Sequence, residues 1–234
     1  ILHLPLNESH LISRYVGLKK FRPTLGKVGS NRWEKTRRQA EEATLDLAAR
    51  LLKNQAERDS ETGHAFPPDS NWQREFEAAF PYKETKDQLL AIEAAKQDMG
   101  KTQPMDRLIC GDVGFGKTEV ALRAAFVTAM EGKQTAIVVP TTLLARQHYQ
   151  VFAQRFADFP VEVAQISRLV PAATIKKVKA GLDSGTVDIV IGTHALLAKD
   201  LRFDRLGLLI VDEEQHFGVA HKERLKSLKT NVHV

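Results

Sequence analysis

The feature that most constrains this chain is a glycine-rich segment near its middle, where residues 111–118 read GDVGFGKT. The segment fits the pattern G-x-x-x-x-G-K-T, whose backbone N–H groups cradle phosphates. Residues 107–110 before it predict a short buried strand, with Cys110 as a small core residue, and residues 120–126 after it carry apolar side chains at helical spacing. Because this is the context that the pattern requires, we predict a nucleotide-binding site here rather than a chance match in a glycine-rich turn.

Each part of this loop has a predicted role. The glycines let the backbone turn its N–H groups inward without a Cβ in the way, and the dipole of the following helix adds partial positive charge beside the phosphates. Lys117 is expected to reach the β- and γ-phosphates, and the hydroxyl of Thr118 to hold Mg²⁺. The predicted nucleotide contacts in the loop are Gly111, Val113, Gly114, Phe115, Gly116, Lys117, Thr118 and Glu119.

A second candidate site follows the apolar run 206–211, which ends in the three acids Asp212, Glu213 and Glu214. Adjacent carboxylates behind a buried strand are typical of an NTPase. Asp212 is expected to hold Mg²⁺ through its water shell, completing the coordination begun by Thr118 and the phosphates. Glu213 is expected to orient and deprotonate the attacking water. The alternative is that the three acids form a solvated turn.

The part of the chain after the glycine loop alternates between short Val/Ile/Leu-rich runs and helical patterns. Near-continuous apolar runs are typical of parallel strands covered on both faces. Alternation of strands and helices at this spacing predicts a doubly wound α/β sheet, with ligands at the carboxyl ends of its strands. The predicted strands are 135–140, 161–166, 187–192 and 206–211, and the predicted helices between them are 143–156 and 172–182.

The N-terminal third has a different character. Leu2, Leu4 and Leu6 alternate with polar residues and predict a strand without a partner in this sequence, followed by a turn at residues 7–9. Residues 19–32 are basic and rich in glycine and proline, as in a linker that is either solvated or in contact with nucleic acid or a protein partner. Residues 34–58 predict a long amphipathic helix that packs against a partner. We therefore expect segments 1–18 (the end of an upstream domain), 19–69 (linker and connector helix) and 70–234.

A short helix at 70–80 leads to a further helix at 88–99, which Thr85 can cap with Gln88 as its capping-box partner. A second interpretation is open, because Phe80 and Gln88 lie about 30 residues before the glycine loop. An aromatic ring and an amide could bind adenine, the ring against the base and the amide on its edge.

Composition sets limits on the rest. The hydrophobic fraction of 43% and the charged fraction of 27% are ordinary for a globular protein, and no apolar run approaches the roughly 18–20 residues that span a bilayer. One cysteine excludes an internal disulfide, and we expect a cytoplasmic protein without a membrane partner. The net charge of +5 permits nucleic-acid binding without requiring it. The absence of an initiator methionine suggests a piece of a longer chain.

Taken in order, the motifs resemble the first motor domain of superfamily-two helicases. They comprise Phe80 to Gln88, GDVGFGKT, PTTLLARQH at 140–148, Ser167-Arg168, IGTHALL at 191–197 and DEEQHFG at 212–218. Fork-reversing helicases and bacterial transcription-repair coupling factors share GDVG-x-GKT and GTH-x-LL. The wording of residues 10–15, 105–121 and 208–214 is similar to the coupling factors almost letter for letter, and the resemblance covers nearly the whole chain.

The resemblance implies a RecA-like P-loop NTPase lobe that uses ATP and Mg²⁺, with Lys117 and Glu213 as catalytic residues. It implies backbone contacts with double-stranded DNA from Thr141, Thr142, Arg146, Ser167, Arg168, Thr193 and His194, although each has a blander interpretation as a helix cap, surface or loop residue. Residues 169–171 (LVP) depart from the usual family sequence, which weakens the assignment of the loop at Ser167.

Further partners are also implied by the resemblance alone. They are RNA polymerase, bound through the upstream domain whose end resembles residues 1–16, a second RecA-like lobe that supplies an arginine finger, and excision-repair proteins. We accordingly expect a motor lobe of a DNA translocase that is nearly inactive without its second lobe. The alternatives are a fork-remodelling helicase lobe and a non-catalytic ATP-binding interaction module.

Overall fold

The computed structural model describes residues 5–11, 31–198, 200–217 and 231–234. The chain divides into two compact units, residues 1–52 and 53–234, and each is described by itself. The predicted strand at Leu2 and Leu4 and the basic linker before residue 31 lie outside the described residues. Leu6 is predicted to belong to the same strand, but it begins a short 3-10 helix, η1 (Leu6–Leu11).

The long helix predicted at 34–58 is confirmed as α1 (Arg32–Ser60), which crosses the boundary between the units. Its described side chains are exposed, including Leu47 and Leu52, and its packing against a partner stays a prediction. The segment boundaries predicted at 18/19 and 69/70 stay predictions. No helix among the described residues is both long and apolar enough to cross a bilayer.

The second unit is built on a four-stranded sheet with the order β2-β3-β1-β4, and every pair of neighbours is parallel. The strands are β1 (Gln134–Val138), β2 (Val163–Ile166), β3 (Ile189–Gly192) and β4 (Leu206–Val211). Ile137 at the centre of β1 is in register with Ile191 on one side and Ile210 on the other. The predicted α/β class and the predicted parallel direction of the strands are confirmed.

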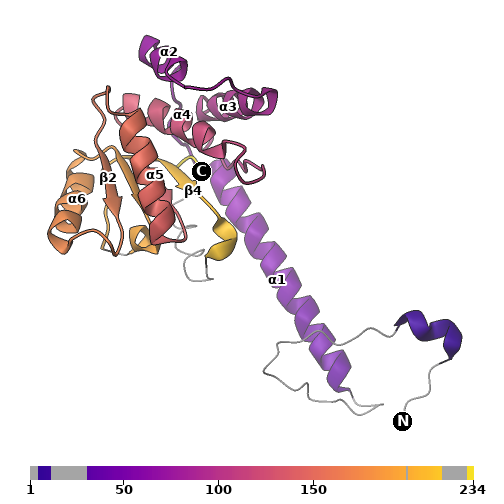
Figure 1. Ribbon diagram of the computed structural model, residues 1–234. Coiled ribbons are helices and arrows are strands. Elements are labelled where there is room, and N and C mark those ends of the chain that lie inside the picture. Colours follow the sequence, from indigo (N-terminus) through magenta and orange to yellow (C-terminus); the bar gives the residue numbers. More distant parts are fainter. Residues whose placement is uncertain (1–4, 12–30, 199, 218–230) are drawn as a thin grey trace. The chain divides into compact units, whose positions relative to one another are not determined.

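Helices cover both faces of this sheet, as the continuous apolar runs predicted (Figure 1). On one face Ile137, Ile189 and Ile191 pack with α4 (Lys117–Met130), α5 (Thr142–Arg155) and Phe76 of α2 (Asn71–Ala78). On the other face the alternate side chains, such as Val138 and Val190, pack with α6 (Ala172–Ser184) and with η2 (His194–Leu197). This alternation of side chains between two cores is the period-two pattern of a strand buried on both faces.

The predicted helix at 88–99 is α3 (Lys86–Met99), which begins two residues earlier, directly after the predicted cap Thr85. The hydroxyl of Thr85 accepts from the backbone N–H of Gln88, and the Gln88 side chain accepts from the backbone N–H of Thr85, which completes the capping box. Helix α2 begins in the same way, because Ser70 accepts from the backbone N–H of Gln73. Both helices pack against α4, so the two caps fix their positions beside the helix that follows the glycine loop.

One predicted element is wrong: residues 107–110 form no strand, and Leu108 and Cys110 are exposed rather than buried. The neighbouring residues 105–107 make their backbone contacts with residues 233–234. Val234 accepts from the backbone N–H of Arg107 (2.9 Å) and donates to the carbonyl of Met105 (2.8 Å), while His233 exchanges backbone hydrogen bonds with Gly207 and Leu209 of β4. Residues 232–234 thus lie between β4 and residues 105–107, and within the described chain residues 108–110 continue past this contact without a ladder partner.

Candidate nucleotide and magnesium site

The glycine loop ends in a backbone conformation that is unfavourable for any residue with a side chain. Gly114 and Gly116 have φ values of 86° and 72°, the left-handed region that glycine enters at little cost. Gly116 is the N-cap of α4, and a Cβ at this position would collide with the side-chain amide nitrogen of Gln88. The two glycines thus allow the turn that leads into α4, at whose N-terminus a phosphate site is expected.

A cavity of about 1330 Å³ lies beside this loop. It brings together the two sites that the sequence predicted separately, because Lys117 and Thr118 line it together with Asp212 and Glu213. Residues 105–110, part of α4, the start of α5 and β4 also line it. A hydroxyl, a carboxylate and an ammonium group around one cavity are suitable ligands for a Mg²⁺–triphosphate, since Mg²⁺ prefers oxygen ligands and phosphate oxygens accept from cations.

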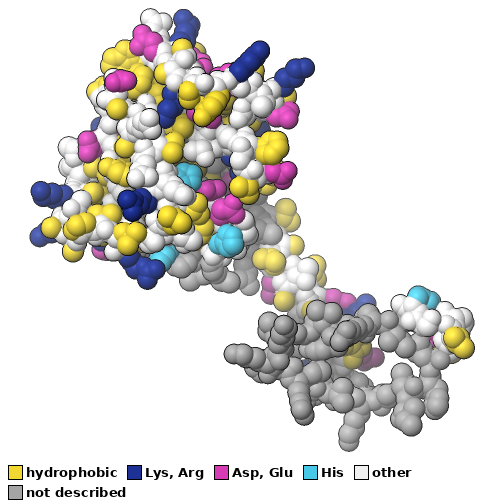
Figure 2. Space-filling model, in the orientation of Figure 1, with side chains coloured by type: hydrophobic (Ala, Val, Ile, Leu, Met, Phe, Trp, Pro, Cys, Tyr) yellow, Lys and Arg dark blue, Asp and Glu magenta, His cyan; other side chains and the backbone are white. Residues whose placement is uncertain are grey.

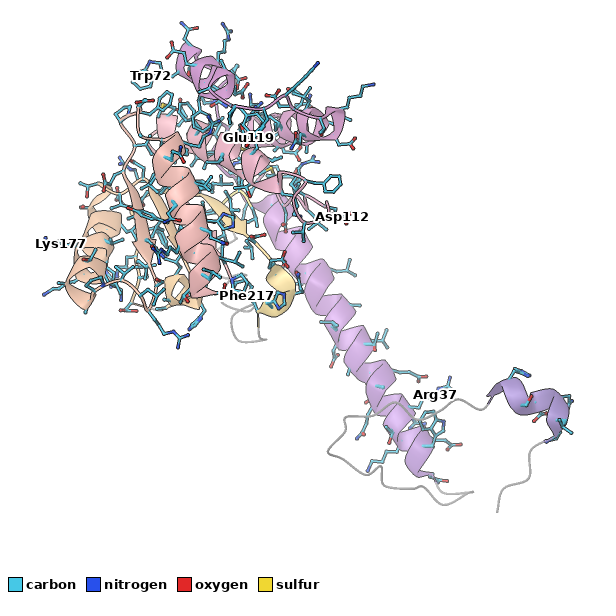
Figure 3. All side chains as sticks on the ribbon, in the orientation of Figure 1. Arg37, Trp72, Asp112, Glu119, Lys177 and Phe217 are labelled. Atoms are coloured by element: carbon cyan, nitrogen blue, oxygen red, sulfur yellow. The ribbon has the colours of Figure 1, made fainter. Side chains whose placement is uncertain are left out.

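Lys117 already uses its ammonium group on the loop. Its Nζ donates to the carbonyl oxygens of Gly111 (2.5 Å) and Asp112 (3.0 Å), and Figure 3 labels Asp112 on the loop that precedes α4. The side chain is thereby held over the loop instead of extending into solvent. Phosphate oxygens placed there would accept from the same ammonium group, with no large movement of the lysine.

Asp212 is the better defined of the two predicted carboxylates. Its Oδ2 lies 3.1 Å from Nε2 of His148, which projects from α5. This hydrogen bond holds the pKa of Asp212 below its usual range, against the opposing effect of burial, and the charge of Lys117 acts in the same direction as the hydrogen bond. Asp212 is therefore ionised at neutral pH, which is the form that binds a metal. Figure 2 shows some histidine and acidic side chains next to each other on the face of the second unit that is turned to the viewer.

Glu213 occupies an unusual backbone conformation. Its φ of 56° and ψ of 47° are left-handed, which for a residue with a side chain costs free energy and occurs often at functional sites. The turn sends the chain directly from β4 into η3 (Glu214–His216) and leaves the Glu213 side chain partly exposed at the cavity. Its carboxylate accepts a hydrogen bond from Gln215. The solvated-turn alternative thus describes Glu214 and Gln215, which are exposed, better than Asp212.

The sequence predicted the capping box of Gln88, but it did not predict the other contacts that Gln88 and Phe80 make. Besides its role in the capping box, Gln88 donates from its amide to the carbonyl of Phe115 in the glycine loop (3.0 Å). Phe80 lies near two guanidinium groups, 5.7 Å from Arg123 and 5.8 Å from Arg155 measured to the ring centroid. Neither residue lines the cavity, so adenine binding by this pair stays a prediction.

Replacing Gln88 with alanine separates these two roles. The capping box predicts a loss of about 1 kcal/mol in the free energy of unfolding, with no preference between bases. An amide that pairs with the adenine edge predicts in addition that the preference for ATP over GTP falls, since an unsatisfied polar group costs about 1–3 kcal/mol. We expect the preference to flatten by more than the stability loss explains, as measured from the Kd of both nucleotides and the melting temperature. A lower melting temperature with an unchanged ATP/GTP ratio would leave Gln88 as a cap alone.

The side chain of Glu119, predicted to bind the nucleotide, points elsewhere. It is 4% exposed and ion-paired with Arg123 (2.9 Å) and Arg155 (3.2 Å), and it lies where α2, α3 and α4 meet (Figure 3). Arg123, itself 3% exposed, also binds Glu84, and that hydrogen bond holds the pKa of Glu84 below its usual range. A carboxylate this deep needs a cation beside it, and nucleotide binding by Glu119 stays a prediction. The i,i+4 spacing of Glu119 and Arg123 on an otherwise apolar helix was a signal that the sequence offered.

The predicted DNA contacts gather along one edge of the sheet, although their exposure differs. Thr141, Ser167 and Thr193 follow β1, β2 and β3, at the same carboxyl edge as Asp212 after β4. Arg146, Arg168 and His194 are exposed, whereas Ser167 and Thr193 are buried. The Thr141 hydroxyl caps α5 by accepting from the backbone N–H of Leu144. Thr142 is the first residue of α5 and is half-buried. Their binding of DNA stays a prediction.

Comparison with known proteins gives a consistent result. Residues 85–233 match the family model of the DEAD/DEAH box helicases. The chain is 50% identical over 233 residues to the transcription-repair-coupling factor of Bacillus subtilis, and 49% identical to that of Staphylococcus aureus. It covers 100% of its own length in both alignments but only 20% of each relative.

Solved structures support the same fold. A RecG bound to a three-way DNA junction is 39% identical and covers 71% of this chain and 23% of its own, with a TM-score of 0.66. A hypothetical ATP-dependent RNA helicase from Sulfolobus tokodaii has a TM-score of 0.53 at 20% identity, covers 70% of this chain and 48% of its own, and supports the fold alone.

Proposed function

Because this chain belongs to the DEAD/DEAH box helicase family, we propose that it is the ATP-binding motor lobe of a double-stranded DNA translocase. In the whole protein this motor would displace stalled RNA polymerase and couple transcription to nucleotide excision repair in the cytoplasm. The observation that carries the proposal is the cavity that Lys117, Thr118, Asp212 and Glu213 line together. The names of relatives about 50% identical over the whole chain support the link to repair.

The residues have distinct roles in this proposal. Lys117 and the first N–H groups of α4 bind the phosphates of ATP. Thr118 and Asp212 hold Mg²⁺, which neutralises charge that develops on the phosphates during transfer. Glu213 orients a water molecule and accepts its proton. Phe80 and Gln88 select adenine.

DNA would bind along the carboxyl edge of the sheet. The exposed cations Arg146 and Arg168, together with His194, can contact phosphates without reading sequence. RNA polymerase, a second lobe and repair proteins would bind elsewhere in the whole protein. A RecG-like fork-remodelling lobe is the second candidate, favoured by the structural likeness at 39% identity. Duplex DNA and a forked junction, tested as stimulators of ATP hydrolysis by the whole protein, distinguish the two.

We expect these 234 residues alone to bind Mg²⁺–ATP and to hydrolyse it very slowly. In related NTPases an arginine finger contributes about 10³–10⁵ in rate, and this motor would take its finger from a second lobe. Steady-state ATPase rates of the 234-residue chain and of a full-length coupling factor, measured side by side, test this. Turnover by the short chain within tenfold of the full-length rate would contradict the half-motor interpretation. An absence of ATP binding would contradict the nucleotide site itself.

Glu213→Gln should separate binding from hydrolysis. The amide keeps the shape of the side chain but cannot accept the proton of the attacking water, while Thr118 and Asp212 still hold the metal. In a full-length protein carrying this motor we expect ATP affinity within about threefold of wild type and a fall of at least about 100-fold in turnover. Equilibrium binding and single-turnover hydrolysis measure the two quantities. Loss of ATP binding together with turnover would show that Glu213 acts in binding.

A further inference from the structure

His148 makes a contact for which the proposed roles do not account. It lies within α5, and its Nε2 is 3.1 Å from Oδ2 of Asp212. The His148 side chain is 13% exposed and that of Asp212 is 31% exposed, so this hydrogen bond is partly shielded from water. The imidazole ring lies beside Phe152, at 6.5 Å between ring centroids, and Phe152 is fully buried in the core between α5 and the sheet. The ring is therefore backed by a part of the fold that does not move easily.

The hydrogen bond from His148 limits rotation about the terminal side-chain torsion of Asp212. The terminal torsion of an aspartate side chain has a broad, roughly two-fold preference, so a carboxylate at the end of a strand can rotate. His148 engages the single oxygen Oδ2 of this carboxylate. This contact restricts the rotation of the carboxylate. The nearby Lys117 adds a favourable charge but has its hydrogen bonds with the loop.

We propose that His148 is a positioning residue for Asp212, which it holds in the orientation that receives Mg²⁺. The proposal rests on the proposed function, in which Asp212 is the protein's carboxylate for the metal. Hydrogen-bond partners of metal-binding carboxylates commonly have this role, and their loss typically lowers metal affinity by about 10–100-fold. His148 belongs to α5 and Asp212 follows β4, so the metal position is set by the packing of a helix against the sheet rather than by the acidic turn alone.

A purely structural role and a competing role for His148 predict different results. If the contact only stabilises the fold, removing it lowers the melting temperature and leaves the Mg²⁺ requirement unchanged. If His148 instead occupies the carboxylate in competition with the metal, removing it makes Mg²⁺ bind more tightly. A positioning role predicts weaker Mg²⁺ binding, with nucleotide binding in the absence of metal unaffected.

The experiment measures binding of a fluorescent ATP analogue to the 234-residue protein, first in EDTA and then across a Mg²⁺ titration. For His148→Ala we expect about a tenfold rise in the Mg²⁺ concentration at half-saturation and an unchanged Kd in EDTA. His148→Gln should recover most of the loss, because its amide N–H can reach the position of Nε2. Gln150→Ala, an exposed position on the same helix, is the matched control and should behave as wild type.

The variant Asp212→Asn tests the proposed function separately from the role of His148. If Asp212→Asn leaves the Mg²⁺ requirement unchanged, Asp212 is not the metal residue and the proposed function is wrong at this point. If it weakens Mg²⁺ binding while a folded His148→Ala stays within twofold of wild type, or binds Mg²⁺ more tightly, the positioning role is wrong. In the double variant we expect no loss beyond that of Asp212→Asn, because both changes act on one interaction.

Discussion

Lys117→Ala is expected to weaken ATP binding by about 100-fold or more. Hydrogen bonds to charged groups contribute about 1.5–3 kcal/mol each, and the lysine ammonium can make more than one to the β- and γ-phosphates. The rest of the cradle consists of backbone N–H groups, which the substitution leaves in place. Isothermal calorimetry or a fluorescent nucleotide measures the Kd directly.

Two controls accompany this substitution. Lys177→Ala removes an exposed lysine on α6 and should leave ATP affinity unchanged, which excludes an effect of net charge alone. Lys117 also donates to Gly111 and Asp112, so its loss loosens the loop, and a melting curve shows how much stability this contact contributes. ATP affinity within threefold of wild type in a folded Lys117→Ala protein would contradict the predicted phosphate site.

Arg123→Met should have the largest effect on stability, a loss of about 3 kcal/mol or more in the free energy of unfolding. The substitution leaves Glu119, 4% exposed, with only the more distant of its two arginine partners, Arg155 at 3.2 Å. Breaking a buried ion pair from one side typically costs about 3–5 kcal/mol. Chemical denaturation with a two-state fit measures the loss. Arg74→Met, on the exposed face of α2, is the matched control and should change stability by less than about 0.5 kcal/mol.

A double variant identifies the cause of this loss. Adding Glu119→Gln to Arg123→Met removes the buried charge that the first change left behind, so part of the stability should return. The two losses would then be non-additive, as for residues in one network. Additive losses would mean that Arg123 acts through packing against Phe80 rather than through its carboxylate partners.

The elements that the sequence predicted correctly are those with local signals. Residues 206–211 form a strand with the predicted bounds because six consecutive apolar residues end at an acidic turn. The capping box of Thr85 and Gln88 depends on a spacing of three residues, which the sequence shows directly. The parallel order of the sheet follows from the alternation of strands and helices. The shared cavity of Lys117 and Asp212 follows because parallel strands place their carboxyl ends at one edge.

The features that local pattern misses depend on residues far apart in the chain. Nothing near residue 107 in the sequence shows that its backbone partner is Val234, so the apolar run beside it predicts a strand that does not form. Arg155, the second partner of Glu119, belongs to α5 and lies 36 residues further along the chain. The contact between His148 and Asp212 joins positions 64 residues apart. The sequence pattern within one helix or strand cannot reveal such pairs, because it does not show which elements pack against each other.

The contact between residues 105–107 and 233–234 has a consequence for the order in which the molecule is made. Met105 donates its backbone N–H to Nδ1 of His233 across 128 residues of sequence. A ribosome adds about 5–20 residues per second, so the segment that leads into the glycine loop waits roughly 6–25 s after its own synthesis for this anchor. Closing so long a loop also carries an entropic cost that a local contact avoids. We expect the nascent chain to protect the strands β1 and β3 before this contact holds the segment that leads into the glycine loop.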